Sequence, residues 1–166
     1  MNEENDVRRS ISSRMFAPRA FVLVLGVMLY FLVDPISARD SCSPTQSDQA
    51  VYRLKEARKR WKTLRVHQKI FAACDDGELA EGYSDAVVTL LAQNWSQFGQ
   101  FVALARDDVA FQRWTMKHID ASASTDDLKK IVEHTSRCTV KADEKELCPM
   151  IRESAEAALS EIEQVD

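Results

Sequence analysis

The chain has 166 residues, which leaves room for a single domain once an N-terminal leader is set aside. Its hydrophobic fraction of 45% excludes a disordered chain, and its net charge of −4 gives no basic excess for binding nucleic acid. Gly and Pro are scarce, and apolar residues after position 45 recur at spacings of three and four. This pattern predicts an all-α fold, a compact bundle or short array of five to six helices.

The N-terminal segment has the pattern of a secretory signal. Residues Ala20 to Val33 are all apolar, four arginines precede them, and Ile36-Ser37-Ala38 follows them. Fourteen apolar residues rise about 21 Å as a helix, less than a hydrocarbon core about 30 Å thick. We therefore expect residues 1–38 to be a cleaved signal peptide and the protein to be periplasmic or secreted.

The alternative is a signal anchor in the inner membrane, with the domain outside the cytoplasm. The first six residues include Glu3, Glu4 and Asp6, which a signal does not need, whereas Met15 offers a shorter start. Translation from Met15 favours release, and translation from Met1 favours an anchor held by the positive-inside rule. On either interpretation, any membrane contact is made by this N-terminal segment.

Residues 39–47 form a polar stretch that we expect to be a linker, and residues 48–166 form the helical domain. The first helix is expected to run from a cap at Ser47 or Asp48 to Ala73, and Gly77 to follow its end. Its core stripe has spacings of three and four. The stripe consists of Ala50, Leu54, Ala57, Trp61, Leu64, Gln68 and Phe71.

The later elements are also predicted to be helical. Residues 78–85 are acidic and favour a weak helix or an ordered loop. The others are a buried central helix over 86–92, a helix over 96–105, a helix capped by Asp107 or Asp108, a helix that begins after Ser124, and a last helix entered at Cys148 and Pro149.

Four cysteines follow the leader: Cys42, Cys74, Cys138 and Cys148. An even number in an exported domain predicts two disulfides. Cys138 and Cys148 flank a predicted turn, so we favour a bond between them. A continuous first helix of roughly 39 Å would keep Cys42 away from Cys74. Either the helix breaks, for which we favour a place near Thr63, or Cys42 pairs with one of the two C-terminal cysteines instead.

The first helix carries an unusual concentration of positive charge. Its candidate binding residues are Arg53, Arg58, Lys59, Lys62, Arg65 and Trp61. With Tyr52 interleaved, they suit an acidic protein partner or an anionic envelope surface. We nevertheless favour internal pairing of these bases with the acids of the C-terminal region, because opposite charges on one small bundle attract at close range; the acids are Glu146, Glu153, Glu156, Glu161 and Glu163.

The signals for catalysis are weak. Acidic residues gather between Cys74 and Asp85, and the sequence His118-Ile119-Asp120 can hold an imidazole beside a carboxylate. No phosphate loop, dinucleotide fingerprint or zinc spacing is present, so we expect no cofactor and no metal. We therefore expect a non-enzymatic binding module of the inhibitor, immunity, chaperone or assembly-factor type. The alternative is a small hydrolase that uses the acidic 74–85 segment with His118.

Overall fold

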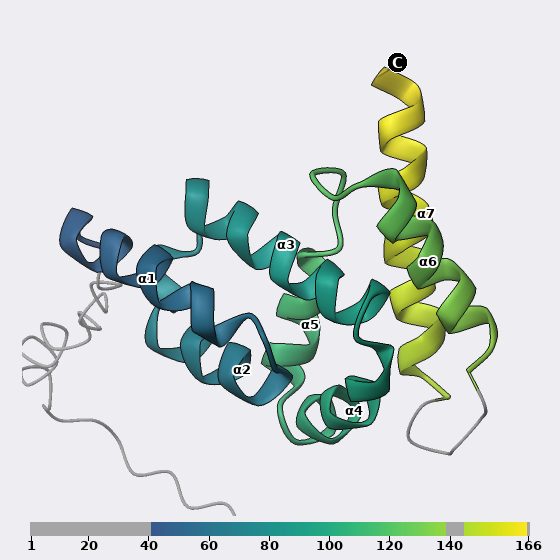
Figure 1. Ribbon diagram of the computed structural model, residues 1–166, viewed down its shortest axis with the longest axis horizontal. Coiled ribbons are helices and arrows are strands. Elements are labelled where there is room, and N and C mark those ends of the chain that lie inside the picture. Colours follow the sequence, from purple (N-terminus) through teal and green to yellow (C-terminus); the bar gives the residue numbers. More distant parts are fainter. Residues whose placement is uncertain (1–40, 139–144, 166) are drawn as a thin grey trace, which may run out of the picture. The chain divides into compact units, whose positions relative to one another are not determined.

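The computed structural model describes residues 41–138 and 145–165, and the regular elements in these ranges are helical (Figure 1). The α-helices are α1 (Pro44–Ala57), α2 (Trp61–Ile70), α3 (Gly77–Ala92), α4 (Phe98–Asp107), α5 (Val109–Lys117), α6 (Thr125–Ser136) and α7 (Leu147–Val165), and the 3₁₀ segments are η1 (Ala72–Cys74) and η2 (Trp95–Gln97). The prediction of an all-α fold is confirmed.

The predicted signal peptide or anchor, residues 1–38, lies outside the described residues. Across the part of the chain that the structure describes, no helix combines the length and the apolar character needed to cross a membrane.

Helix α1 begins within the segment that we expected to be a linker. Ser43 caps it through a capping box, in which the Ser43 hydroxyl accepts from the amide of Gln46 at 3.3 Å and the Gln46 side chain accepts from the amide of Ser43 at 3.0 Å. Pro44 occupies the first turn, where its missing N–H costs nothing. The linker prediction is therefore wrong for residues 44–47.

A break divides the predicted first helix into α1 and α2. Arg60 has extended backbone, with φ −149° and ψ 143°, and the chain turns over residues 58–60. The Thr63 hydroxyl lies 2.8 Å from the carbonyl oxygen of Ala57 and 2.9 Å from that of Arg60. It thus contacts the carbonyl that ends α1 and that of Arg60, which also accepts from the amide of Leu64 at 2.9 Å. The break accounts for seven α-helices in the described ranges, rather than five or six.

The buried centre is built around α3, which packs against α1 and α6. Nine of its 16 residues are buried, as predicted for the 86–92 region. The helix also includes the acidic 78–85 segment, because Asp76 caps its first turn by accepting from the amide of Gly77 at 2.8 Å. Gly77 has a positive φ of 50° and begins α3, rather than following the end of the first helix.

The predicted cap at Ser47 or Asp48 is wrong, because Ser43 caps α1, but two later predicted caps are confirmed. The Asp108 carboxylate accepts from the amide of Phe111 at 3.0 Å and starts α5. The Ser124 hydroxyl accepts from the amide of Asp127 at 3.2 Å and starts α6.

Two disulfides connect these helices. One joins Cys42 to Cys74, with the Cα atoms 4.8 Å apart, and the other joins Cys138 to Cys148, with the Cα atoms 6.6 Å apart. The first ties Cys42, which precedes the Ser43 cap of α1, to η1, and the break at residues 58–60 makes it sterically possible. The second closes the connection between α6 and α7.

Candidate functional site

A groove of about 470 Å³ runs between α1 and α2. Helix α1 contributes Tyr52, Arg53, Lys55, Glu56 and Ala57, and α2 and the residue after it contribute Thr63, Val66, His67, Ile70 and Phe71. The two helices face each other because the chain reverses at the break and the Cys42–Cys74 disulfide holds the open end. The groove therefore depends on the interruption of the predicted long helix.

Large apolar side chains are exposed along this groove. The exposed fractions are 74% for Tyr52, 53% for Val66 and 63% for Ile70. Val66 and Ile70 lie four residues apart, so they share one face of α2. Exposed apolar residues that gather at a groove are typical of interaction sites, whereas scattered ones are not. Sequence reasoning missed Val66 and Ile70, although their position off the core stripe was the available signal.

The positive charges around the groove are only partly neutralised. Arg58 pairs with Asp85 on α3, Lys59 pairs with Glu56 at 2.7 Å, and Arg65 and Lys69 both pair with Asp108, at 2.9 Å and 2.8 Å. Among the described residues, the remaining four bases of these helices make no ion pair. They are Arg53, Lys55, Arg60 and Lys62.

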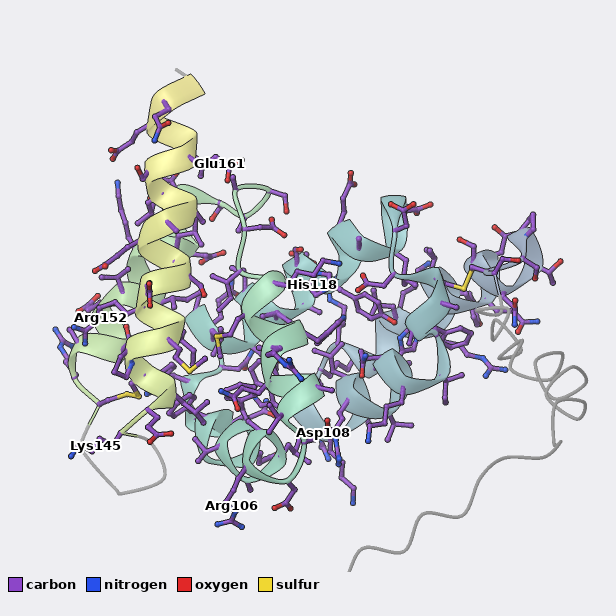
Figure 2. The ribbon with its side chains drawn as sticks, turned by 180° about the vertical axis from the view of Figure 1, so that it is seen from behind. Arg106, Asp108, His118, Lys145, Arg152 and Glu161 are labelled. Atoms are coloured by element: carbon purple, nitrogen blue, oxygen red, sulfur yellow. A yellow bond between two sulfur atoms is a disulfide. The ribbon has the colours of Figure 1, made fainter. Side chains whose placement is uncertain are left out.

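The acids that neutralise α1 and α2 differ from those predicted. Within the described ranges, their ion pairs go to Asp85, Glu56 and Asp108, and none goes to the acids of α7 or to Glu146. Figure 2 shows Glu161 on α7, far from α1 and α2, with Asp108 nearer the middle of the helical unit. Internal pairing with the C-terminal acids is therefore wrong for the bases of α1 and α2.

Trp61 cannot belong to a binding surface, because its side chain is fully buried. Its ring packs against Phe101 at 4.7 Å and against the edge of Phe111 at 6.4 Å, measured between ring centroids. The other predicted binding residues, Arg53, Arg58, Lys59, Lys62 and Arg65, are exposed or half-buried. The core-stripe interpretation of Trp61 is the one that the structure supports.

His67 forms part of the groove wall, and its ring is buried. Nε2 lies 3.0 Å from the carbonyl oxygen of Ala50, and Nδ1 lies 2.9 Å from the hydroxyl of Tyr83. Nε2–H therefore donates to the carbonyl while Nδ1 accepts from the phenol, an arrangement of the neutral ring. Burial lowers the pKa of His67, the Ala50 bond raises it, and the charge of Arg53 lowers it, leaving the pKa below 6.5.

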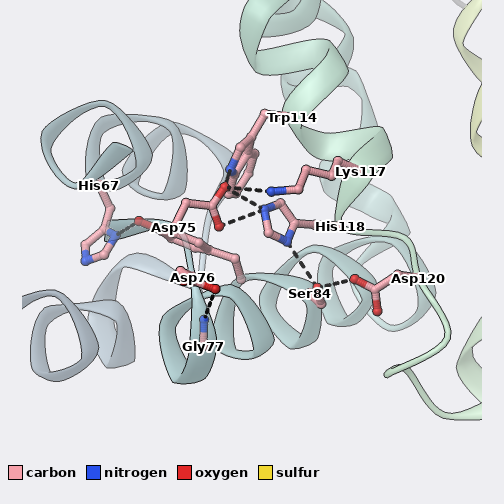
Figure 3. Close-up of polar contacts among 10 residues, drawn as sticks. His67, Asp75, Asp76, Gly77, Ser84, Trp114, Lys117, His118 and Asp120 are labelled. Atoms are coloured by element: carbon pink, nitrogen blue, oxygen red, sulfur yellow. Dashed lines mark hydrogen bonds and ion pairs between the residues drawn. The ribbon is translucent and has the colours of Figure 1, made fainter. Parts of the chain in front are cut away.

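A second polar cluster lies within the core, where α3 meets the end of α5 (Figure 3). The His118 ring is 2% exposed, with Nε2 3.2 Å from each carboxylate oxygen of Asp75 and Nδ1 3.1 Å from the hydroxyl oxygen of Ser84. Ser84 in turn lies 2.7 Å from a carboxylate oxygen of Asp120. The structure thus places Asp75, and not Asp76, against His118.

Both carboxylates in this cluster are held ionised. Burial raises the pKa of Asp75, but the hydrogen bond and charge of His118, the charge of Lys117 and the hydrogen bond from Trp114 outweigh it, so its pKa lies below the ordinary value. Burial likewise raises the pKa of Asp120, and hydrogen bonds from Ser122 and Ser84 more than offset this. Because carboxylates only accept, the Ser84 hydroxyl donates to Asp120 and accepts from Nδ1 of His118.

This directionality limits what the cluster can do chemically. Both ring nitrogens of His118 are already engaged, Nδ1 with the Ser84 hydroxyl and Nε2 with Asp75, so neither faces an incoming nucleophile. Ser84 lies in the middle of α3 and is 2% exposed. The cluster is arranged to join α3, η1 and the end of α5 through a connected set of buried hydrogen bonds.

Comparison with protein-family models, with curated proteins and with solved structures gave no match. Within residues 41–138 and 145–165, no group of three or more His, Cys, Asp or Glu side chains is placed to hold a metal ion.

Proposed function

We propose that the protein is an exported, non-enzymatic binding module that recognises a protein partner through the groove between α1 and α2. The observation that carries this proposal is the coincidence, in one groove, of three exposed apolar side chains with two bases, Arg53 and Lys55, that lack an ion-pair partner among the described residues. Two disulfides in one small domain support an oxidising compartment outside the cytoplasm.

The shape of the site supports a protein segment rather than a flat anionic surface. A groove receives side chains that project from an extended or helical segment, whereas a membrane surface is contacted best by a convex face. The apolar wall of Val66 and Ile70 supplies burial, and Arg53 and Lys55 beside it favour an acidic segment.

The hydrolase alternative has less support. His118 is paired through both ring nitrogens, and the serine beside it is buried and hydrogen-bonded to Asp120. Asp76, one of the acids of the 74–85 segment, caps α3. A nucleophile without access to solvent offers no position for a substrate.

Site-specific photo-crosslinking tests the proposal. A photoreactive benzoylphenylalanine replaces Ile70 in the groove or, as a matched control, the exposed Lys129 on α6. Irradiation of intact cells is expected to give a discrete, heavier protein adduct from position 70 and none from position 129. Equal labelling at both positions, or adducts that contain lipid alone, would overturn the proposal.

A further inference from the structure

The acidic face of α7 carries carboxylates that no base in the described part of the molecule neutralises. Among the described residues, the four glutamates of this helix make no ion pair, and Arg152 is its one base. The glutamates are Glu153, Glu156, Glu161 and Glu163. Arg152 itself donates to the carbonyl oxygen of Thr135 at 2.7 Å. The helix is therefore strongly negative along its exposed side.

The C-terminal part of α7 extends beyond the helix that covers it. Helix α7 has 19 residues and its antiparallel neighbour α6 has 12, so their lengths are roughly 28 Å and 18 Å at 1.5 Å per residue. The last turns of α7 project past α6 (Figure 1). Leu159 and Ile162 lie in this part, are partly buried and pack against the core of their own chain. The side of this segment that is left to solvent carries mainly its glutamates.

Carboxylates flank these apolar residues at helical spacing. Glu156 precedes Leu159 by three residues and Glu163 follows it by four, so all three share one side of α7. Tyr52, Val66 and Ile70 line the groove beside Arg53 and Lys55. The exposed carboxylates at the end of α7 therefore match the bases of the groove in charge.

These two surfaces do not meet within one chain. Helices α1 and α2 lie at one end of the helical unit and α7 at the other, in both views (Figures 1 and 2). Since the chain as a whole is acidic, with a net charge of −4, the basic groove is a local exception that an acidic helix can neutralise.

We propose that the segment bound in the groove is the C-terminal part of α7 from a second copy of this chain. This inference rests on the proposed function, because it names the partner of the same groove. The contact joins two different surfaces, so two reciprocal contacts close a dimer, whereas single contacts continue into rings or chains. Arg53 and Lys55 of one copy then face Glu156 and Glu163 of the next.

Charge reversal with mixing tests this inference. One variant reverses the groove, Arg53→Glu with Lys55→Glu, and the other reverses the helix, Glu156→Lys with Glu163→Lys. The control, Lys129→Glu with Lys145→Glu, makes the same charge change as the groove variant at exposed positions elsewhere. Each full-length protein, isolated from the cell envelope, is measured by sedimentation velocity over a range of concentrations. Any association through the leader is common to all of them.

Wild-type protein and control are expected to self-associate, and each reversed variant alone to associate at least about tenfold more weakly. An equimolar mixture of the two reversed variants is expected to regain association, because the basic α7 of one meets the acidic groove of the other. A mixture that associates as weakly as its two components overturns the inference. A groove variant that associates as strongly as the wild-type protein also overturns it.

The failure of this inference and the failure of the proposed function are distinguishable by the mass of the adduct formed at position 70. An adduct with the mass of two chains supports self-association. An adduct with a different protein overturns the second-copy assignment while leaving the groove as a binding site.

Discussion

Cys42 and Cys74 are separated by 32 residues in sequence, yet their Cα atoms lie 4.8 Å apart. Helices α1 and α2 lie between them, so the bond fixes the two walls of the groove at its open end. The groove is consequently a product of two local features, the disulfide and the break at residues 58–60.

Removal of this disulfide should cost more stability than removal of the other. The Cys42–Cys74 bond closes a longer loop than Cys138–Cys148, with sequence separations of 32 and 10. The loss of loop-closure entropy predicts that the free energy of unfolding falls by roughly 3.7 kcal/mol when Cys42 and Cys74 are both replaced by Ser, and by roughly 2.8 kcal/mol when Cys138 and Cys148 are. Urea unfolding measures both losses, and peptide mapping without reductant checks the pairing. A larger loss for the Cys138–Cys148 variant would contradict this ranking.

Thr63→Val should destabilise the α1–α2 turn by about 1 kcal/mol, because the carbonyl of Ala57 loses the Thr63 hydroxyl as its donor, whereas that of Arg60 keeps the Leu64 amide. Thr45→Val, in the first turn of α1, is the matched control, since its hydroxyl makes no hydrogen bond to a described residue. Urea unfolding of both variants gives the comparison. Equal stability of the two variants would mean that the Thr63 hydroxyl does not stabilise the break.

The sequence predicted much of this fold because caps and periodicity act locally. The caps at Asp108 and Ser124 and the buried central helix followed from residue type and spacing. The break was different: no Gly or Pro marks residues 58–60, and the apolar stripe continues through Ala57 and Trp61. The reach of the chain between Cys42 and Cys74 required a break, which we expected near Thr63, and the structure places it a few residues earlier, at residues 58–60.

The candidate site was less predictable because its contacts are distant in sequence. The excess of bases was visible, but the acids that neutralise Arg58 and Arg65 come from α3 and from the start of α5. Similarly, His118 was expected beside Asp120, its neighbour in sequence, whereas Asp75 contacts the ring. Charge counts reveal that pairing is needed, and only the packing of helices decides the partners.

Asp108 should be among the more costly acids to replace. Its pKa is held well below the usual range by hydrogen bonds from Lys69 and the Phe111 amide, against the opposing effect of burial. Asp108→Asn keeps a capping side chain and removes the charge, so we expect a loss of about 1 kcal/mol, whereas Asp108→Ala loses both and costs about 2 kcal/mol.

The control for Asp108 is the exposed Asp107→Asn, for which thermal unfolding should show almost no change. Because the folded carboxyl has a lowered pKa, the contribution of Asp108 is complete at neutral pH and is lost as the pH falls below about 3.8. Variants of Asp107 and Asp108 with equal stabilities would contradict this account.

His67 should make stability depend on pH in the mildly acidic range. Its pKa is below 6.5 in the folded protein, so the unfolded chain binds the proton more readily. The contribution of His67 to the free energy of unfolding is therefore complete above about pH 6.5. It decreases as the pH falls from there towards the pKa of His67 in the folded protein. An NMR titration of the His67 ring measures this pKa directly, and a value at or above 6.5 would refute the prediction.

The most direct test of groove binding is the crosslink yield from Ile70 in cells, measured with and without Arg53→Glu and Lys55→Glu. An acidic segment bound between α1 and α2 predicts a clear adduct in the wild-type background and a yield at least about tenfold lower after charge reversal. An adduct of undiminished yield, or none in either background, would contradict the account.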